Sequence, residues 1–207
     1  MRIGIFGGTF DPPHIGHLVL AADALEQLNL DRLLWVLTPV PPHKQGQAIS
    51  PTEQRLRLVQ TAIAGEERFE LSRVDLDRPG PHYAIDSVRL LQEQYPDAEL
   101  IYLLGGDSLR DLPIWYRPQE LIQQVSLLGV MHRPGVSIDP EELEGQLPGI
   151  VQKVCYFNSP LLDISSSEIR LRIAQGRSFR YFLPAPVFDL IRQNRYYQQN
   201  TSHDHPE

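Results

Sequence analysis

The sequence is poor in cysteine and has no long apolar run. Its 207 residues include a single cysteine, Cys155, which cannot form a disulfide within the chain, so a disulfide-stapled scaffold is excluded. No apolar run approaches the roughly 18 residues that a membrane-spanning helix needs. The first residues form a short apolar segment that ends in glycine, which is not the pattern of a secretory signal. We therefore expect a cytoplasmic protein that does not enter a membrane.

Positive charge is also scarce. The chain has 19 Lys and Arg against 26 Asp and Glu, and its formal net charge of −7 repels nucleic acid. A nonspecific DNA- or RNA-binding protein is thereby disfavoured, and any anionic ligand should be small. The content of 42% hydrophobic and 22% charged residues is that of a globular protein. We expect one domain over residues 1–197, large enough to bury its own core, and a flexible tail over 198–207.

Segments of strand and helix character alternate along the chain. Short apolar runs predict strands over residues 2–6, 33–37, 100–104, 127–131 and 151–157. Apolar residues at helical spacing predict helices over 17–28, 51–63 and around 88–91. Strands that alternate with helices in this way form a mostly parallel sheet with right-handed crossovers. The sequence therefore predicts an α/β fold of the Rossmann-like, doubly wound type, with helices on both faces of the sheet.

Several helix starts carry capping signals. Residues 50–53, Ser-Pro-Thr-Glu, predict a capping box with proline at the first helical position. Residues 139–142, Asp-Pro-Glu-Glu, predict another capped start, and so do residues 165–168, Ser-Ser-Ser-Glu. A last helix is expected to begin near Ala185.

The most informative stretch, residues 7–17, follows the first predicted strand and reads Gly-Gly-Thr-Phe-Asp-Pro-Pro-His-Ile-Gly-His. Glycines permit close backbone approach, and the N-terminus of the following helix favours an anion such as phosphate. His14 and His17 are three residues apart, so both can face one side of the first turn and donate hydrogen bonds to one anion. Taken singly, each histidine is explained as well by capping or core packing. A zinc site would need ligands beyond these two.

Two further segments follow predicted strands and should reach the same edge of the sheet. Asp107, in Gly-Gly-Asp-Ser, can accept hydrogen bonds from ribose hydroxyls, and Trp115 offers a face for a flat ring, although alone it is explained by core packing. Residues 164–170 read Ile-Ser-Ser-Ser-Glu-Ile-Arg, where Arg170 joins the free amides of a helix N-terminus in a set that can hold a polyphosphate. Capping alone explains half of that pattern. Lys44 adds a cation in a proline-rich loop, or is an ordinary surface lysine.

These motifs resemble those of the nucleotidyltransferase superfamily. Residues 14–17 match its H-x-G-H signature, and residues 164–170 are similar to its I-S-S-T-x-I-R motif, with Ser167 in place of threonine. Class I aminoacyl-tRNA synthetases share the first motif, but they need a longer chain, a tRNA-binding surface and a K-M-S-K-S loop. Pro-Pro-His-Lys, Gly-Gly-Asp-Ser-Leu, Ile-Trp-Tyr and Arg-Pro-Gly occur between the two motifs. The series resembles the bacterial nicotinate-nucleotide adenylyltransferases over about residues 1–195.

The resemblance implies transfer of AMP from ATP to nicotinate mononucleotide, giving nicotinate adenine dinucleotide and pyrophosphate, with Mg²⁺ bound through the ATP phosphates and no metal site on the protein. The implied catalytic residues are His14, His17, Lys44 and Arg170. The implied ATP contacts are Gly7, Gly8, Thr9, Phe10, Gly105, Asp107, Ile164, Ser165, Ser166 and Ser167. The implied mononucleotide contacts are His43, Lys44, Tyr83, Ala84, Asp107, Trp115, Tyr116 and Arg133.

The chain departs from the family pattern at two positions, and other functions stay open. Ala84 stands where relatives often carry threonine or serine, and Val40 lies in the phosphate loop. A related transferase could use nicotinamide mononucleotide or phosphopantetheine as acceptor, although the pantetheine enzymes usually have shorter chains. A noncatalytic nucleotide sensor is the third candidate, which we expect to have lost a phosphate-binding group. A homo-oligomer is possible.

Overall fold

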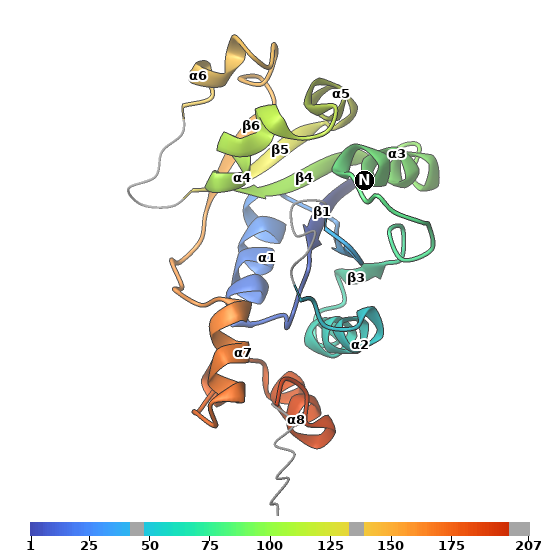
Figure 1. The fold of residues 1–207 in the computed structure, drawn as a ribbon. Helices are drawn as coiled ribbons and strands as arrows, with labels where there is room; N and C mark the ends of the chain where they lie inside the picture. Colours follow the sequence, from blue (N-terminus) through green and yellow to red (C-terminus); the bar gives the residue numbers. More distant parts are fainter. Residues whose placement is uncertain (42–47, 133–138, 199–207) are drawn as a thin grey trace, which may run out of the picture.

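A parallel sheet forms the centre of the computed structural model, which describes residues 1–41, 48–132 and 139–198 (Figure 1). Within these residues its strands are β1 (Arg2–Gly8), β2 (Arg32–Leu37), β3 (Phe69–Ser72), β4 (Glu99–Gly105), β5 (Leu127–His132) and β6 (Val154–Asn158). They lie in the order β3-β2-β1-β4-β5-β6, and every neighbouring pair is parallel. This is the strand order of a Rossmann sheet, in which the order reverses between the first and fourth strands. The predicted fold class is confirmed.

Helices cover both faces of the sheet. On one face, α1 (Ile15–Gln27) and α2 (Thr52–Ile63) contribute to one apolar cluster. On the other face, a second cluster is formed with α3 (Ala84–Gln94), α4 (Gly106–Asp111), α5 (Pro118–Gln124) and α6 (Glu141–Glu144). The short 3₁₀ helix η2 (Leu112–Ile114) follows α4. None of the helices in the described ranges is long and apolar enough to cross a membrane.

Strand β2 shows why its sequence is a continuous apolar run. Leu33, Trp35 and Leu37 belong to the cluster beneath α1 and α2, whereas Leu34 and Val36 belong to the cluster beneath α3. Successive side chains of a strand point to opposite faces, and both faces are covered here. The run is therefore apolar at every position instead of at every second one.

The last two helices form a separate layer beside α2. They are α7 (Ser166–Ala174) and α8 (Ala185–Asn194), joined through the 3₁₀ helix η3 (Arg180–Phe182), and they lie next to α2 in Figure 1. Their buried residues Ile169, Ile173, Val187 and Ile191 pack with Leu58 of α2 in a third cluster. This packing keeps the start of α7 in a fixed place relative to the sheet.

Short elements account for most of what the sequence did not predict. Strand β3 has four residues, and its partly apolar pattern is too short to form a recognisable run. Helices α4 and α5 begin after Gly105 and Arg117, and in the described part of the chain neither helix has a capping hydrogen bond from a side chain. Strand β6 begins at Val154 instead of residue 151, because the Val154 amide closes a turn by donating to the Ile150 carbonyl.

The capping box predicted over residues 50–53 is wrong. Helix α2 begins at Thr52, and Pro51 is its N-cap instead of its first helical residue. The backbone amide of Ser50 donates to the Asp11 carboxylate at 3.1 Å, and its carbonyl accepts from Arg55 at 2.9 Å. Tertiary hydrogen bonds thus fix the chain entering this helix, without a side-chain cap.

The other two capping predictions are confirmed in part. Pro140 is the N-cap of the short helix α6, and the Asp139 carboxylate before it accepts from the Glu141 amide at 3.0 Å. The Ser165 hydroxyl accepts from the Glu168 amide at 3.2 Å and caps α7 as predicted. The Glu168 carboxylate instead forms ion pairs with Arg172 and Arg177.

The packing of β5 yields a prediction on stability. An ideal Cβ at Gly129 would lie 2.6 Å from a terminal carbon of Leu28, 2.8 Å from one of Leu103 and 3.3 Å from one of Ile101. All three side chains are buried, so Gly129→Ala should lower the free energy of unfolding by about 1–3 kcal/mol through overpacking. Gly145→Ala is the control, because no atom of the described part of the chain lies within 4 Å of a Cβ built there. Equal denaturant midpoints for the two variants would contradict the packing described here.

Candidate functional site

The loop after β1 rests on packed aromatic rings. Phe10 is buried, and its ring centroid lies 5.4 Å from that of Phe6 and 5.0 Å from that of Trp35. Its φ of 47° lies in the left-handed region, which non-glycine residues rarely adopt without support from their surroundings. A Cβ at Gly8 would come within 2.7 Å of the Phe10 ring, and one at Gly7 within 3.2 Å of the Tyr102 hydroxyl. Both glycines are thus explained by the protein's own packing.

The two histidines lie together at the start of α1. Their ring centroids are 3.7 Å apart, and His14 is the N-cap of the helix. A Cβ at Gly16 would lie 3.1 Å from Nδ1 of His14, so glycine at this position lets the imidazole fold over the first turn. The spacing H-x-G-H therefore has a steric reason as well as a chemical one.

Both rings carry the neutral form of imidazole. The backbone amide of His14 donates to Nδ1 of His17 at 3.1 Å, so the proton of the neutral His17 ring is assigned to Nε2. Burial lowers the pKa of His14 to about 4, and its Nδ1 has no hydrogen-bond partner among the described residues. A neutral imidazole carries one N–H group, the kind of donor that can bind an anion.

Asp11 connects this loop with distant parts of the chain. Its buried carboxylate accepts from the Ser50 amide at 3.1 Å and from the Tyr197 hydroxyl at 2.9 Å. Arg170 donates to the Asp11 backbone carbonyl at 2.6 Å, and its guanidinium lies 3.8 Å from the carboxylate. The starts of α2 and α7 and the segment after the last helix thus meet at one acidic side chain.

Arg55 is buried in the same region and makes five hydrogen bonds. It donates to the carbonyls of Thr9, Thr38, Pro39 and Ser50 and to the hydroxyl of Thr52, at 2.8 to 3.3 Å. Burial lowers the pKa of this arginine, and the nearby Asp11 opposes that effect. The guanidinium joins the glycine-rich loop, the end of β2 and the start of α2. Sequence reasoning missed Arg55, although a cation at helical spacing from Leu58 and Val59 was a signal.

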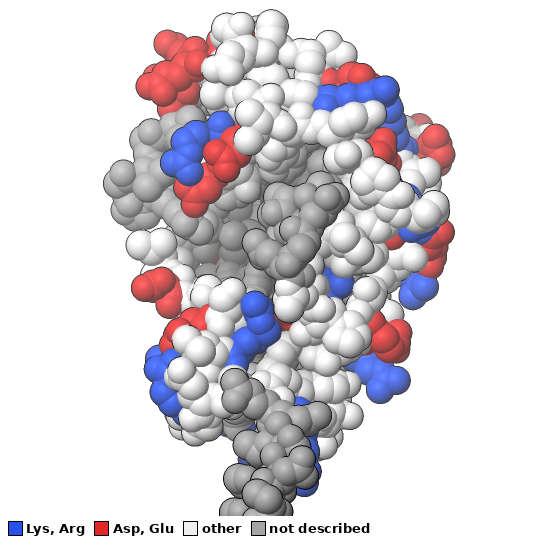
Figure 2. Space-filling model, in the orientation of Figure 1, with Lys and Arg blue, Asp and Glu red and all other residues white. Residues whose placement is uncertain are grey.

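The serine motif lies against the glycine-rich loop. The Ser166 hydroxyl donates to the Pro12 carbonyl at 2.8 Å, and Arg170 lies 3.4 Å from the hydroxyl of Ser167. The structure therefore brings residues 7–17 and 164–170 together. In the space-filling view, Lys and Arg side chains lie among Asp and Glu side chains in the region of α7 (Figure 2). Ile164 joins the cluster formed with α7 and α8.

The end of β4, next to β1, carries the third predicted segment. Among the described residues, no atom lies within 4 Å of a Cβ built on Gly105, so these residues leave the space beside it open. Asp107 lies in the first turn of α4, where its exposed carboxylate pairs with Arg110 at 2.9 Å. This edge of the sheet is where Rossmann folds bind their ligands.

The predicted pyridine-binding residues come from two elements. Tyr83 is the N-cap of α3, and its ring stacks on that of Tyr116 at a centroid distance of 4.1 Å. Trp115 meets the partly buried ring of Tyr102 edge-on at 6.3 Å. Burial raises the pKa of Tyr102. Because the Tyr102 hydroxyl lies beside Gly7, this aromatic group adjoins the end of β1.

A buried polar network supports the start of α3. Oδ1 of Asp75 lies 2.6 Å from the Ser87 hydroxyl and 2.8 Å from Arg78. The Ser87 hydroxyl also lies 3.2 Å from the Tyr83 carbonyl, so the network reaches the residue that precedes Ala84. No sequence pattern indicates this group, because its members are polar residues scattered over turns, loops and a helix.

Three predicted residues, His43, Lys44 and Arg133, lie outside the described residues. Among those described, no group of three or more His, Cys, Asp or Glu side chains is placed to hold a metal ion.

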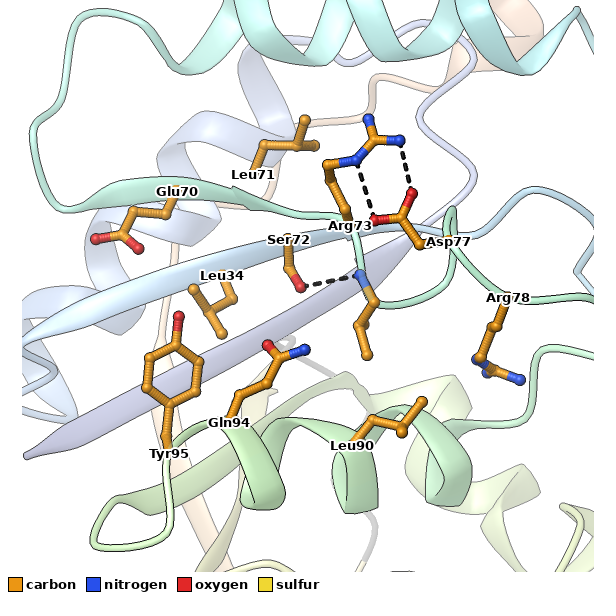
Figure 3. Close-up of a pocket in the computed structure, with 11 residues that line it drawn as sticks. Leu34, Glu70, Leu71, Ser72, Arg73, Asp77, Arg78, Leu90, Gln94 and Tyr95 are labelled. Atoms are coloured by element: carbon orange, nitrogen blue, oxygen red, sulfur yellow. Dashed lines mark hydrogen bonds and ion pairs between the residues drawn. The ribbon is translucent and has the colours of Figure 1, made fainter.

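A hollow of about 380 Å³ lies elsewhere, between the edge strand β3 and α3 (Figure 3). Its lining includes Leu34, Ser72 and Gln94 and none of the predicted site residues. The cations at its rim are already paired, Arg73 with Asp77 and Arg78 with Asp75. We therefore place the candidate site at the ends of β1 and β4 and not in this hollow.

The chain is also similar to known proteins. Residues 5–172 match the family model described as cytidylyltransferase-like. The chain is 44% identical to a probable nicotinate-nucleotide adenylyltransferase of Thermomicrobium roseum, over 95% of this chain and 92% of that protein. It is also 44% identical to a protein of the same name from Gloeobacter violaceus, over 95% and 96% of the two chains.

A solved structure has the same fold. It is the nicotinic acid mononucleotide adenylyltransferase of Plasmodium falciparum complexed with NaAD, with a TM-score of 0.75 and 21% identity over 95% of this chain and 97% of that one. The chain therefore belongs to the cytidylyltransferase-like family, in the group of the nicotinate-nucleotide adenylyltransferases.

Proposed function

We propose that this protein transfers AMP from ATP to nicotinate mononucleotide, forming nicotinate adenine dinucleotide and pyrophosphate in NAD biosynthesis. The observation that carries the proposal is the direct contact between the glycine-rich loop and the start of α7, through Ser166 with Pro12 and Arg170 with Asp11. Two segments that resemble nucleotidyltransferase motifs thus form one anion-binding edge. The relatives at 44% identity carry the same activity in their names.

The reaction does not require a general base. The attacking group is a phosphate monoester, which is largely a dianion at pH 7 because its second pKa is about 6. Catalysis then depends on in-line placement and on stabilisation of the charge that develops on the α-phosphate and the departing pyrophosphate. We assign His14 and His17 to the α-phosphate as neutral donors.

The outer phosphates are assigned to the start of α7. The Ser166 hydroxyl proton is already donated to Pro12, so we expect Ser166 to contribute its backbone amide, as a first-turn residue without an intrahelical acceptor. Ser167 contributes its amide in the same way. Arg170 has donors left beyond its bond to Asp11, and its side chain is 32% exposed. Lys44 completes this set in the proposal.

The acceptor is assigned to the start of α3 and the loop after η2. The first-turn amide of Ala84 and the amide of Tyr116 would donate to the carboxylate on the pyridine ring, and Trp115 would stack on the ring. A carboxylate only accepts hydrogen bonds, whereas a carboxamide would face one of these donors with its own NH₂ group. Asp107 would bind the ribose hydroxyls. His43 would contact the mononucleotide, and Arg133 would bind its phosphate.

Nucleotidyltransferases of this family generally use a divalent metal. The Asp11 carboxylate, near the histidines, already faces the Ser50 amide, the Tyr197 hydroxyl and Arg170. It is therefore poorly placed to bind a metal ion, which the nucleotide would hold instead. We propose Mg²⁺, bound through the ATP phosphates. When bound, it neutralises phosphate charge.

Residues 1–197 act as one domain in this proposal, since Tyr197 bonds to the loop that follows β1. A cytoplasmic location and a homo-oligomeric state stay predictions from the sequence.

The acceptor decides between the candidate functions. Pyrophosphate release should follow mixing of ATP with nicotinate mononucleotide, with kcat/KM about 10–200-fold higher than with the nicotinamide compound, because the amide leaves one bond unmade. Phosphopantetheine should give no release. Competition between both mononucleotides at equal low concentration measures the preference. A dominant amidated product would overturn the acid assignment, and no release with any acceptor would favour a sensor.

The role of His17 can be separated from its part in capping α1. His17→Asn keeps an oxygen that can accept from the His14 amide, whereas His17→Ala removes this acceptor as well. Both variants should lower kcat by about 10²–10³-fold, as expected when a preorganised donor is lost, while only His17→Ala should lose about 1 kcal/mol of stability. Steady-state kinetics and denaturant unfolding measure the two effects. If His17→Asn keeps more than about a third of the wild-type kcat, the role of His17 is structural and not catalytic.

Burial of neutral His14 makes stability depend on pH. The pKa of His14 is about 4 in the folded protein against an ordinary value of 6.5 for an exposed histidine, so the unfolded chain binds more protons between these values. The free energy of unfolding should therefore fall as pH drops from 7 to 4, by up to about 3 kcal/mol from this residue. Urea unfolding of wild type and His14→Gln across this range isolates the contribution. Parallel curves for the two proteins would show that His14 is not buried in neutral form.

A further inference from the structure

We propose that Tyr197 is a positioning residue for ATP binding: its hydroxyl holds the Asp11 carboxylate, and thereby leaves the Arg170 guanidinium available to the outer phosphates. The inference deepens the proposed function and depends on the assignment of Arg170 made there. None of the sequence motifs includes Tyr197.

The backbone beyond α8 is bent to bring this side chain into place. Arg195 has a φ of 53° and Tyr197 a φ of 64°, both in the left-handed region. Such conformations are uncommon for residues with a side chain and persist where the surroundings compensate for them. The compensation here includes the bond of 2.9 Å from the Tyr197 hydroxyl to Oδ1 of Asp11, and packing against the cluster formed with α7 and α8. The chain therefore returns to the loop that follows β1.

The Asp11 carboxylate has few ways to replace this bond. Its side chain is only 4% exposed, so bulk water has little access to it. Oδ2 accepts from the Ser50 amide, and Oδ1 accepts from Tyr197. A buried charge without a hydrogen-bond donor has a high free energy. A carboxylate oxygen that loses one donor is therefore stabilised by forming a bond to another.

Arg170 is a cation close enough to replace the lost donor. Its guanidinium already donates to the Asp11 carbonyl at 2.6 Å and lies 3.8 Å from Oδ2. If the Tyr197 hydroxyl is removed, the carboxylate should draw the guanidinium inward to form a closer ion pair. Phosphate would then have to compete with Asp11 for the donors of Arg170. Burial and the neighbouring Asp11 both raise the pKa of Tyr197, so the phenol stays a donor at neutral pH.

The test compares two neighbouring tyrosines. Tyr197→Phe removes the hydroxyl and little else, and Tyr196→Phe is the matched control, because Tyr196 packs in the same cluster without a hydroxyl contact to Asp11. Calorimetry should give Tyr197→Phe a dissociation constant for ATP about 3–10-fold higher than that of wild type, a fraction of what a charge-assisted bond contributes, with little change for AMP. KM for nicotinate mononucleotide should stay constant. Tyr196→Phe should match wild type in all three.

Arg170→Ala and the double variant separate the possible outcomes. Arg170→Ala should weaken ATP more than AMP, and adding Tyr197→Phe should then cause no further loss, because Tyr197 acts through Arg170. Additive losses, or equal losses for ATP and AMP, would overturn the positioning role. So would a lower melting temperature of Tyr197→Phe with unchanged ATP binding. If Arg170→Ala itself shows no preference for ATP, the assignment of Arg170 to the outer phosphates fails, and the inference fails with it.

Discussion

The buried guanidinium of Arg55 is the interaction on which the geometry of the site depends. All of its N–H groups are used, and four of the five acceptors are backbone carbonyls that no helix or sheet satisfies. Removing the guanidinium would leave several polar atoms unpaired at once, which costs far more than the loss of a single surface bond. The positions of the loop after β1, the end of β2 and the entry to α2 are therefore coupled to one side chain.

A chain of net charge −7 is an unexpected host for a polyphosphate. The candidate site resolves this without a large positive field. Its proposed donors are neutral imidazoles, the amides of helix N-termini and one guanidinium that is partly engaged by Asp11. Short-range donors of this kind recognise an anion at contact distance, whereas long-range attraction would also gather nucleic acid. The charge balance therefore favours selectivity over nonspecific capture.

The sequence predicted most of the sheet and the meeting of residues 7–17 with residues 164–170, because both depend on local patterns. Strands covered on both faces, such as β2, give unbroken apolar runs, and the motifs follow the ends of strands. The sequence did not predict the roles of Arg55, Asp75 and Tyr197, because the role of each depends on partners that folding brings close. The capping box at Ser50 failed for the same reason: a local signal was overridden by the tertiary bonds of Asp11 and Arg55.

The bond between Asp11 and Tyr197 joins residues 186 positions apart, and Arg170 reaches the same aspartate across 159 positions. During synthesis the first βαβ unit leaves the ribosome long before these partners do. Until they follow, the Asp11 carboxylate in the loop after β1 lacks their hydrogen bonds. A ligand that binds only the finished edge stabilises only chains that have reached this stage. Nucleotide binding would thus stabilise fully folded chains and leave nascent chains unaffected.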